Sequence, residues 1–232
     1  TVEHFNSLTE NSKALKRIRN DLSFLKTIDT EYIAAALNYL DKSKSQLRQD
    51  LFVLSELGFK HGGYFVEFGA TDGIKFSNTH LLEREFGWHG ILAEPARLWH
   101  QRLRENRTAH LELSCIWKET GCELEFQEVS GGIGGELSAI AKFSGRDQHA
   151  KSRQNSIVYP VDTISLNDLL AKHKAPREID YLSIDTEGSE LEILSEFDFD
   201  SYDISVITCE HNFTSDRSEI HSLLTSNGFV RK

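Results

Sequence analysis

The sequence predicts an α/β protein in which a doubly wound parallel sheet carries helices on both faces, with a helical extension before the first strand. Three observations predict this fold. An apolar run at Tyr64–Phe68 is typical of a buried strand, and it stops at a loop that contains Gly69 and Gly73. Downstream, apolar runs of strand length alternate with segments of helical period. Upstream, apolar residues recur every three or four positions, the spacing of an amphipathic helix.

The upstream helical pattern runs from Leu15 to Leu54 and ends near Gly58. Its steps of three and four predict two or three helices. We therefore expect residues 1–58 to form a helical cap and residues 59–232 to form the main domain, with 118–160 as an insertion. The cap either packs on the sheet as support or covers the ligand site as a lid, and the spacing favours support.

Composition limits the class of protein. The 232 residues are enough for one main domain, and 26 basic against 36 acidic residues give a net charge of -10, which disfavours nucleic acid as the main partner. No apolar run is long enough to cross a membrane, and the given N-terminus lacks the basic-then-apolar pattern expected of a signal peptide. Three cysteines without CxxC spacing favour a reducing compartment, so we expect a cytoplasmic protein. Because the chain lacks an initial Met, we expect either a tagged form or a piece of a longer protein.

The loop after the first strand resembles the glycine loop of nucleotide-binding α/β units, which lies at the carboxyl end of the strand. The third glycine of the dinucleotide pattern is absent, and Thr71 stands inside the loop. This departure favours a ligand without a pyrophosphate and disfavours an oxidoreductase that uses a nicotinamide cofactor. Glu94 follows Gly73 by 21 residues, close to the spacing at which an acid accepts hydrogen bonds from a ribose diol.

The rest of the chain alternates strands and helices except in the glycine-rich insertion. There we expect a hairpin or a mobile loop around Gly131, Gly132, Gly134, Gly135 and Gly145. Ser165 is a natural cap for the helix that follows the insertion. The expected strands are 90–94, 109–117, 124–129, 159–164, 179–185 and 204–209, and the expected helices are 81–86, 96–105, 166–172, 189–196 and 216–226. A last strand begins after Asn227-Gly228, and the missing further strands favour a trimmed C-terminus.

Four of the expected strands end in polar residues at their carboxyl side: Glu67 to Gly73, Glu94-Pro95, Asp185 to Gly188, and Glu210-His211. In a parallel sheet these ends lie along one edge, where the crevice at the reversal of strand order binds ligands. Any one of these acids could simply cap a helix. Together they predict a functional crevice.

These residues also carry a resemblance to a family. The segments VEFGATDG, GILAEP, VDTISLNDLL, YLSIDTEGSE and SQLRQDLFVL, in this chain's order from about Ser45 to Lys232, resemble the FkbM-type family of S-adenosylmethionine-dependent methyltransferases. Ser183 departs from the pattern, because many members carry Lys there. The resemblance implies a Rossmann-like methyltransferase sheet and S-adenosylmethionine as cofactor.

The resemblance also implies roles for individual residues. Gly69, Ala70 and Gly73 would line the amino-acid half of the cofactor, with Glu67 or Asp72 near its ammonium group. Adenine would lie toward the end of the third strand. The residues expected to bind the cofactor are Gln46, Glu67, Gly69, Ala70, Asp72, Gly73, Asn78, Glu94, Pro95, Ser114, Cys115 and Ile116.

The chemistry expected is O-methylation of a hydroxyl on a sugar, glycan or natural product. The hydroxyl proton would be removed by a carboxylate or a histidine, or acidified by a divalent cation, Mg²⁺ or Ca²⁺. The catalytic candidates are Asp185, Glu187, Glu210 and His211, of which Asp185, Glu210 and His211 are also the candidate metal ligands. An N-methyltransferase or a non-catalytic binding module remains an alternative, and the N-terminal helices could mediate self-association.

Overall fold

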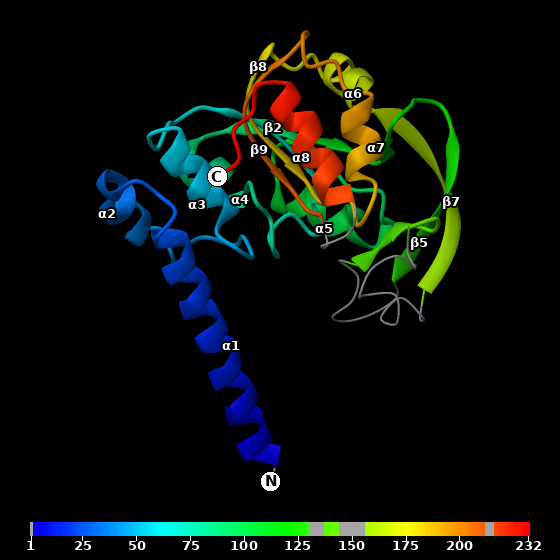
Figure 1. The fold of residues 1–232 in the computed structure, drawn as a ribbon. Coiled ribbons are helices and arrows are strands. Elements are labelled where there is room, and N and C mark those ends of the chain that lie inside the picture. The colour runs from blue at the N-terminus through cyan, green and yellow to red at the C-terminus, as the bar shows by residue number, and fades with distance from the viewer. Residues whose placement is uncertain (1, 130–136, 144–155, 212–215) are drawn as a thin grey trace.

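The centre of the molecule is a five-stranded parallel sheet (Figure 1). The structure is a computed structural model, and it describes residues 2–129, 137–143, 156–211 and 216–232, with side chains at residue 12 and from 14 onward. The order of the strands in the sheet is β3-β2-β1-β8-β9, and every pair is parallel. Their bounds are β1 Tyr64–Phe68, β2 His89–Ala93, β3 His110–Glu112, β8 Glu178–Ile184 and β9 Asp203–Cys209.

Strand β1 is the middle of this sheet, and all five of its residues are buried. Val66 is paired with Ile91 of β2 on one side and with Leu182 of β8 on the other. The chain builds β2 and β3 outward from β1 in one direction, then returns to add β8 and β9 in the other. The order therefore reverses between β1 and β8, where open α/β sheets bind their ligands.

Helices cover both faces of the sheet, as a doubly wound fold requires. One face carries Phe65 and packs against α3 Gln49–Glu56, α4 His80–Phe86 and α5 His100–Asn106. The other face carries Val66 and packs against α6 Leu166–Lys172, α7 Glu190–Ser195 and α8 Asp216–Ser226. The predicted cap of α6 is confirmed, because the Ser165 hydroxyl accepts a hydrogen bond from the backbone N–H of Asp168. A short 3₁₀ turn, η2 Arg97–Trp99, precedes α5.

A second sheet stands beside the first, and it corrects two sequence predictions. Its order is β4-β7-β5-β6, from β4 Cys115–Trp117, β5 Glu123–Val129, β6 Ala139–Ile140 and β7 Ser156–Ser165. The single strand expected over 109–117 is wrong, because the chain leaves the first sheet after Glu112 and enters the second at Cys115. The strand expected at 159–164 exists as part of β7, but it belongs to the second sheet.

The break between β3 and β4 has a local cause. The Glu112 side chain accepts hydrogen bonds from the backbone N–H groups of Leu113 and Ser114, at 3.1 and 3.0 Å, and so turns the chain at this point. Further along, β5 and β7 pair antiparallel, as a hairpin insertion would. The glycines at 131, 132, 134, 135 and 145 lie outside the described residues.

The N-terminal segment forms α1 Val2–Leu25, η1 Thr30–Tyr32 and α2 Ile33–Leu37. Helix α1 extends away from the two sheets and meets the rest of the chain at its C-terminal end (Figure 1). There Phe24 is buried against the α3 face. Leu15, Ile18 and Leu22 are more than half exposed, so the expectation that these side chains pack on the sheet is wrong.

Two further observations concern the ends of elements. No strand forms after Gly228 within the described residues, so the predicted start of a last strand there is wrong. Among the helices that the structure describes, none has both the length and the apolar character needed to cross a bilayer.

Candidate functional site

A cavity of about 350 Å³ opens at the carboxyl ends of β1, β2, β8 and β9, where the sequence predicts a crevice. Residues from all four strand ends line it, together with the start of α3 and part of the second sheet. Of the candidate residues, the lining brings together Gln46, Glu67, Gly69, Asn78, Glu94, Pro95, Cys115, Ile116, Asp185, Glu187 and Glu210.

Four candidates from the loops are not in the lining. Ala70 is buried in the core between the sheet and α3. The Asp72 carboxylate accepts hydrogen bonds from the backbone N–H groups of Ile74 and Lys75, so it stabilises its own turn. Gly73, at the end of the loop, packs against Arg107 and Leu103. The backbone N–H of Ser114 donates a hydrogen bond to Glu112.

His211 is also outside this cavity. It lines a different one, between β9 and the C-terminal residues, together with Arg217 and His221. The sequence predicts His211 beside Asp185 and Glu210, but the structure places it in the lining of a different cavity.

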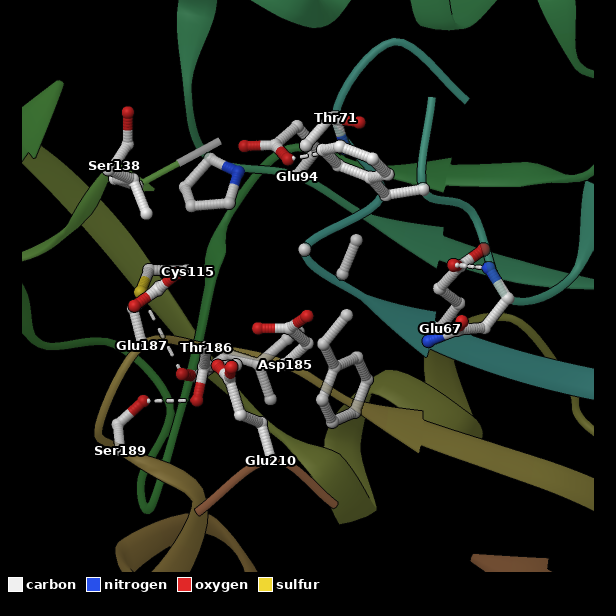
Figure 2. Close-up of a pocket in the computed structure, with 18 of the residues that line it drawn as sticks. Glu67, Thr71, Glu94, Cys115, Ser138, Asp185, Thr186, Glu187, Ser189 and Glu210 are labelled. Carbon is white, nitrogen blue, oxygen red and sulfur yellow. Dashed lines mark hydrogen bonds between the residues drawn. The ribbon is translucent and has the colours of Figure 1, made fainter. Parts of the chain in front are cut away.

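The two sides of the cavity differ in character, as Figure 2 shows. We call the side formed by Glu67, Gly69, Thr71, Asn78 and Glu94 the loop wall. The opposite side, formed by Asp185, Glu187 and Glu210 at the ends of β8 and β9, is called the acidic wall.

The two walls meet at Gly69. Its φ of +74° is one that glycine adopts readily, and a Cβ built on it would lie 2.2 Å from the backbone oxygen of Asp185. The loop after β1 and the end of β8 thus touch through their backbones at the point where the strand order reverses. No other residue fits this position.

Glu94 is the buried acid of the loop wall, with 4% of its surface exposed. Its carboxylate accepts hydrogen bonds from the backbone N–H groups of Thr71, at 2.7 Å, and Ala96, at 2.8 Å. Burial raises the pKa of Glu94 to about 7, although these two hydrogen bonds act in the opposite direction. A carboxylate has about four acceptor positions, so this group can still accept hydrogen bonds from a diol.

Glu67 is engaged by the protein itself. Its oxygens accept hydrogen bonds from the hydroxyl groups of Ser77 and Thr79 and from the backbone N–H of Asn78. The guanidinium of Arg107 lies 3.8 Å from the same carboxylate. This side chain therefore ties the end of β1 to the start of α4.

Asn78 connects the loop wall to the segment before α3. Its side-chain oxygen accepts a hydrogen bond from the Ser45 hydroxyl at 2.6 Å, and its NH₂ donates to the Ser183 hydroxyl at 2.9 Å. Gln46, next to Ser45, is exposed and contributes to the lining. Ser183 thus serves as a buried hydrogen-bond partner.

The acidic wall concentrates negative charge. Asp185, Glu187 and Glu210 each place one carboxylate oxygen within 4.8 Å of the others. Enclosure by protein raises the pKa of Asp185 well above its ordinary value, and a hydrogen bond with Glu210 and its charge act in the same direction. Because the Asp185 side chain is open to the cavity, water weakens the effect of burial on its pKa. The repulsion from Glu210 still raises that pKa. Asp185 therefore holds a proton more strongly than an isolated carboxyl group does.

Sequence reasoning missed some residues of this site. Glu190 accepts hydrogen bonds from the backbone N–H groups of Thr186 and Gly188, so it shapes the turn after β8. Within this turn Glu187 has a φ of +58°, which costs a non-glycine residue energy. The acid-rich run after β8 was the available signal, but nothing in it separates the turn-shaping acid from those that face the cavity.

The second sheet also contributes two residues that the sequence did not indicate. Phe126 of β5 and Ile140 of β6 line the cavity next to Cys115 and Ile116 of β4. Burial raises the pKa of the Cys115 thiol to about 12, so this thiol stays neutral and acts as apolar lining. One part of the cavity is therefore apolar enough for a flat ring.

The comparison with known families agrees with this geometry. Residues 67–231 match the model of the methyltransferase FkbM domain, which is most of the chain. No curated protein and no solved structure matches the chain significantly. The chain belongs to the FkbM methyltransferase family.

Proposed function

We propose that the protein uses S-adenosylmethionine to methylate a hydroxyl of a sugar, glycan or natural product. The observation that carries the proposal is that the glycine loop, Glu94 and the acidic wall face one another in the same cavity. The family supports methyl transfer, and the loop without a third glycine supports a cofactor without phosphates.

The residues present fit this cofactor. Glu94 would accept hydrogen bonds from the ribose hydroxyls, beside Pro95, and the apolar part of the lining, with Cys115 and Ile116, would hold adenine. Gln46 is better suited than Asn78 to the methionine carboxylate, because the Asn78 amide already bridges Ser45 and Ser183. When bound, the cofactor supplies an electrophilic methyl group on a sulfonium.

The acidic wall would handle the proton. Asp185, whose pKa is raised by burial and by the neighbouring Glu210, would accept the hydroxyl proton in its ionised form. Alignment of the acceptor oxygen with the methyl carbon would supply much of the remaining acceleration. Glu187, from the turn after β8, would orient the acceptor.

A divalent cation is a weaker proposal. Its support is that Asp185, Glu187 and Glu210 each place one carboxylate oxygen within 4.8 Å of the others, and carboxylate oxygens are ligands that Mg²⁺ accepts. An amine acceptor has one observation in its favour, since these three carboxylates would attract an ammonium group.

We also propose that residues 1–58 act as a separate cap on the methyltransferase domain, 59–232. Gln46 and Gln49 bring this segment into the cavity lining. The exposed side chains of Leu15, Ile18 and Leu22 support self-association through α1. Sedimentation of the wild-type protein and of Ile18→Glu would test that association.

Calorimetry with S-adenosylmethionine and with NAD tests the main proposal. We expect binding of the first and none of the second, and absence of S-adenosylmethionine binding would refute the function. Incubation of cell extracts with methyl-labelled cofactor would then identify the acceptor. Binding without transfer to any acceptor would favour the non-catalytic alternative, and labelled amines would favour N-methylation. Loss of transfer with a chelator, restored by Mg²⁺ or Ca²⁺, would establish the cation.

A further inference from the structure

A buried guanidinium lies beneath the glycine loop, where no sequence pattern points to it. Arg107 directly follows α5, and its side chain has 0% exposure. It donates hydrogen bonds to the backbone oxygen of Gly73 at 3.0 Å, to the Ser77 hydroxyl at 3.1 Å and to the Thr79 hydroxyl at 2.8 Å. One side chain thus holds three successive points of the segment between β1 and α4.

The fit between Arg107 and this segment is close. A Cβ added to Gly73 would lie 2.5 Å from Cγ of Arg107 and 2.8 Å from Leu103. The guanidinium also lies over the ring of Phe65 in β1, 5.6 Å from its centroid. Arg107 therefore packs against the loop on the side that faces away from the cavity.

Two buried carboxylates balance this charge. Glu83 of α4 accepts a hydrogen bond from Nε of Arg107 at 2.9 Å, and Glu67 lies 3.8 Å from the guanidinium. Burial alone would raise the pKa of Glu83, but the charge of Arg107 and hydrogen bonds from Thr108 hold it below its ordinary value. Loss of the guanidinium would leave two negative charges in a dry environment.

The contacts continue from Arg107 to the cavity. Ser77 and Thr79 each accept a hydrogen bond from Arg107 and donate one to Glu67. Glu67 in turn fixes the backbone N–H of Asn78, and both Glu67 and Asn78 line the cavity. Arg107 itself does not line it.

We propose that Arg107 is a positioning residue, which holds the loop after β1 in the shape that binds the cofactor without contacting it. This inference rests on the proposed function, since it assigns the loop to the S-adenosylmethionine site. A planar fork with five donors can hold three oxygens and a carboxylate at once, whereas a lysine ammonium has three donors.

Three variants test the proposal. We expect Arg107→Lys to weaken S-adenosylmethionine binding at least tenfold in calorimetry and to raise its KM, with kcat at saturation within about threefold of wild type. Thr79→Val should weaken binding in the same direction, and Thr79→Ser, which keeps the hydroxyl, should restore it. Thr79→Val keeps the proposal testable if Arg107→Lys does not fold.

Two further measurements separate positioning from general stability. Leu170→Ala, in α6 on the opposite face of the sheet, should lower Tm yet leave cofactor affinity unchanged below Tm. In the unliganded protein, amide hydrogen exchange over residues 69–79 should be faster in Arg107→Lys than in Leu170→Ala. Folded Arg107→Lys and Thr79→Val proteins with wild-type affinity and exchange would overturn the inference and leave the proposed function intact. A wild-type protein that binds no S-adenosylmethionine would overturn both.

Discussion

On the loop wall, the carboxylates of Glu67 and Glu94 accept hydrogen bonds from backbone N–H and hydroxyl groups. On the acidic wall, the carboxyl groups of Asp185 and Glu210 lie close together, and their charges repel. The first arrangement fixes a shape before a ligand arrives. In the second arrangement, protonation of one carboxylate would relieve the repulsion between the two. The difference supports the proposal that the loop wall serves binding and the acidic wall serves chemistry.

The largest effect should come from Gly69→Ala, which acts where the two walls meet. The added Cβ would lie 2.2 Å from the backbone oxygen of Asp185, so the walls must separate. We expect a loss of more than 100-fold in cofactor affinity, measured by calorimetry. Gly62→Ala is the matched control, since Gly62 has a φ of +71° and open space around it, and should cost only about 1 kcal/mol of stability. Equal affinities of the two variants would contradict this account.

Asp185→Asn should separate chemistry from binding. We expect methyl transfer to fall by roughly 10²-fold or more, with cofactor affinity nearly unchanged. A folded-state pKa above the unfolded value means that ionised Asp185 destabilises the fold as pH rises above about 4. At pH 8 the variant should therefore be more stable than wild type, by up to about 1 kcal/mol after screening by water. At low pH the two proteins should be equally stable.

Urea unfolding at pH 4 and pH 8 measures that stability difference. Asp200→Asn, at an exposed position outside the cavity, is the control and should show no such gain. A stability difference that does not grow with pH would contradict the proposed repulsion within the acidic wall.

A pH dependence should appear at Glu94. Its pKa of about 7 means that the carboxylate is mostly protonated at pH 6 and mostly ionised at pH 8. If the ionised form accepts hydrogen bonds from the ribose, affinity should rise about tenfold over this range. 5′-Methylthioadenosine is the suitable probe in calorimetry, because it has the ribose without the titrating amino-acid end.

Glu94→Gln should abolish this pH dependence, while Glu112→Gln should keep it. Glu112 is the equivalent buried acid at the end of the neighbouring strand β3, but it does not line the cavity. A pH profile unchanged in Glu94→Gln would refute the ribose role.

The smallest effect should come from His211→Ala. His211 belongs to the lining of the second cavity, so affinity for S-adenosylmethionine and the transfer rate should stay within about twofold of wild type. A loss of more than tenfold in rate would restore His211 to the site.

The sequence predicted the sheet well because four strand ends carry their acids directly after apolar runs. Glu94, Asp185 and Glu210 could be placed from that pattern alone. It could not separate His211 from Glu210, since successive residues at a strand end point in opposite directions. Arg107 was missed because a single arginine beyond a helix end has no spacing that marks it. The break at Glu112 was missed because Ala109–Trp117 is interrupted by neither Gly nor Pro.

That break has a consequence for how such proteins diversify. The chain leaves the first sheet after β3 and returns at β8, so the antiparallel strands β5, β6 and β7 can change in length or sequence without shifting the register of β1 with β2 or β8. Yet this excursion supplies Phe126 and Ile140 to the cavity. Exchange of these strands between members of the family would then reshape the apolar part of the cavity, beside Cys115 and Ile116, while the register of the first sheet stays fixed.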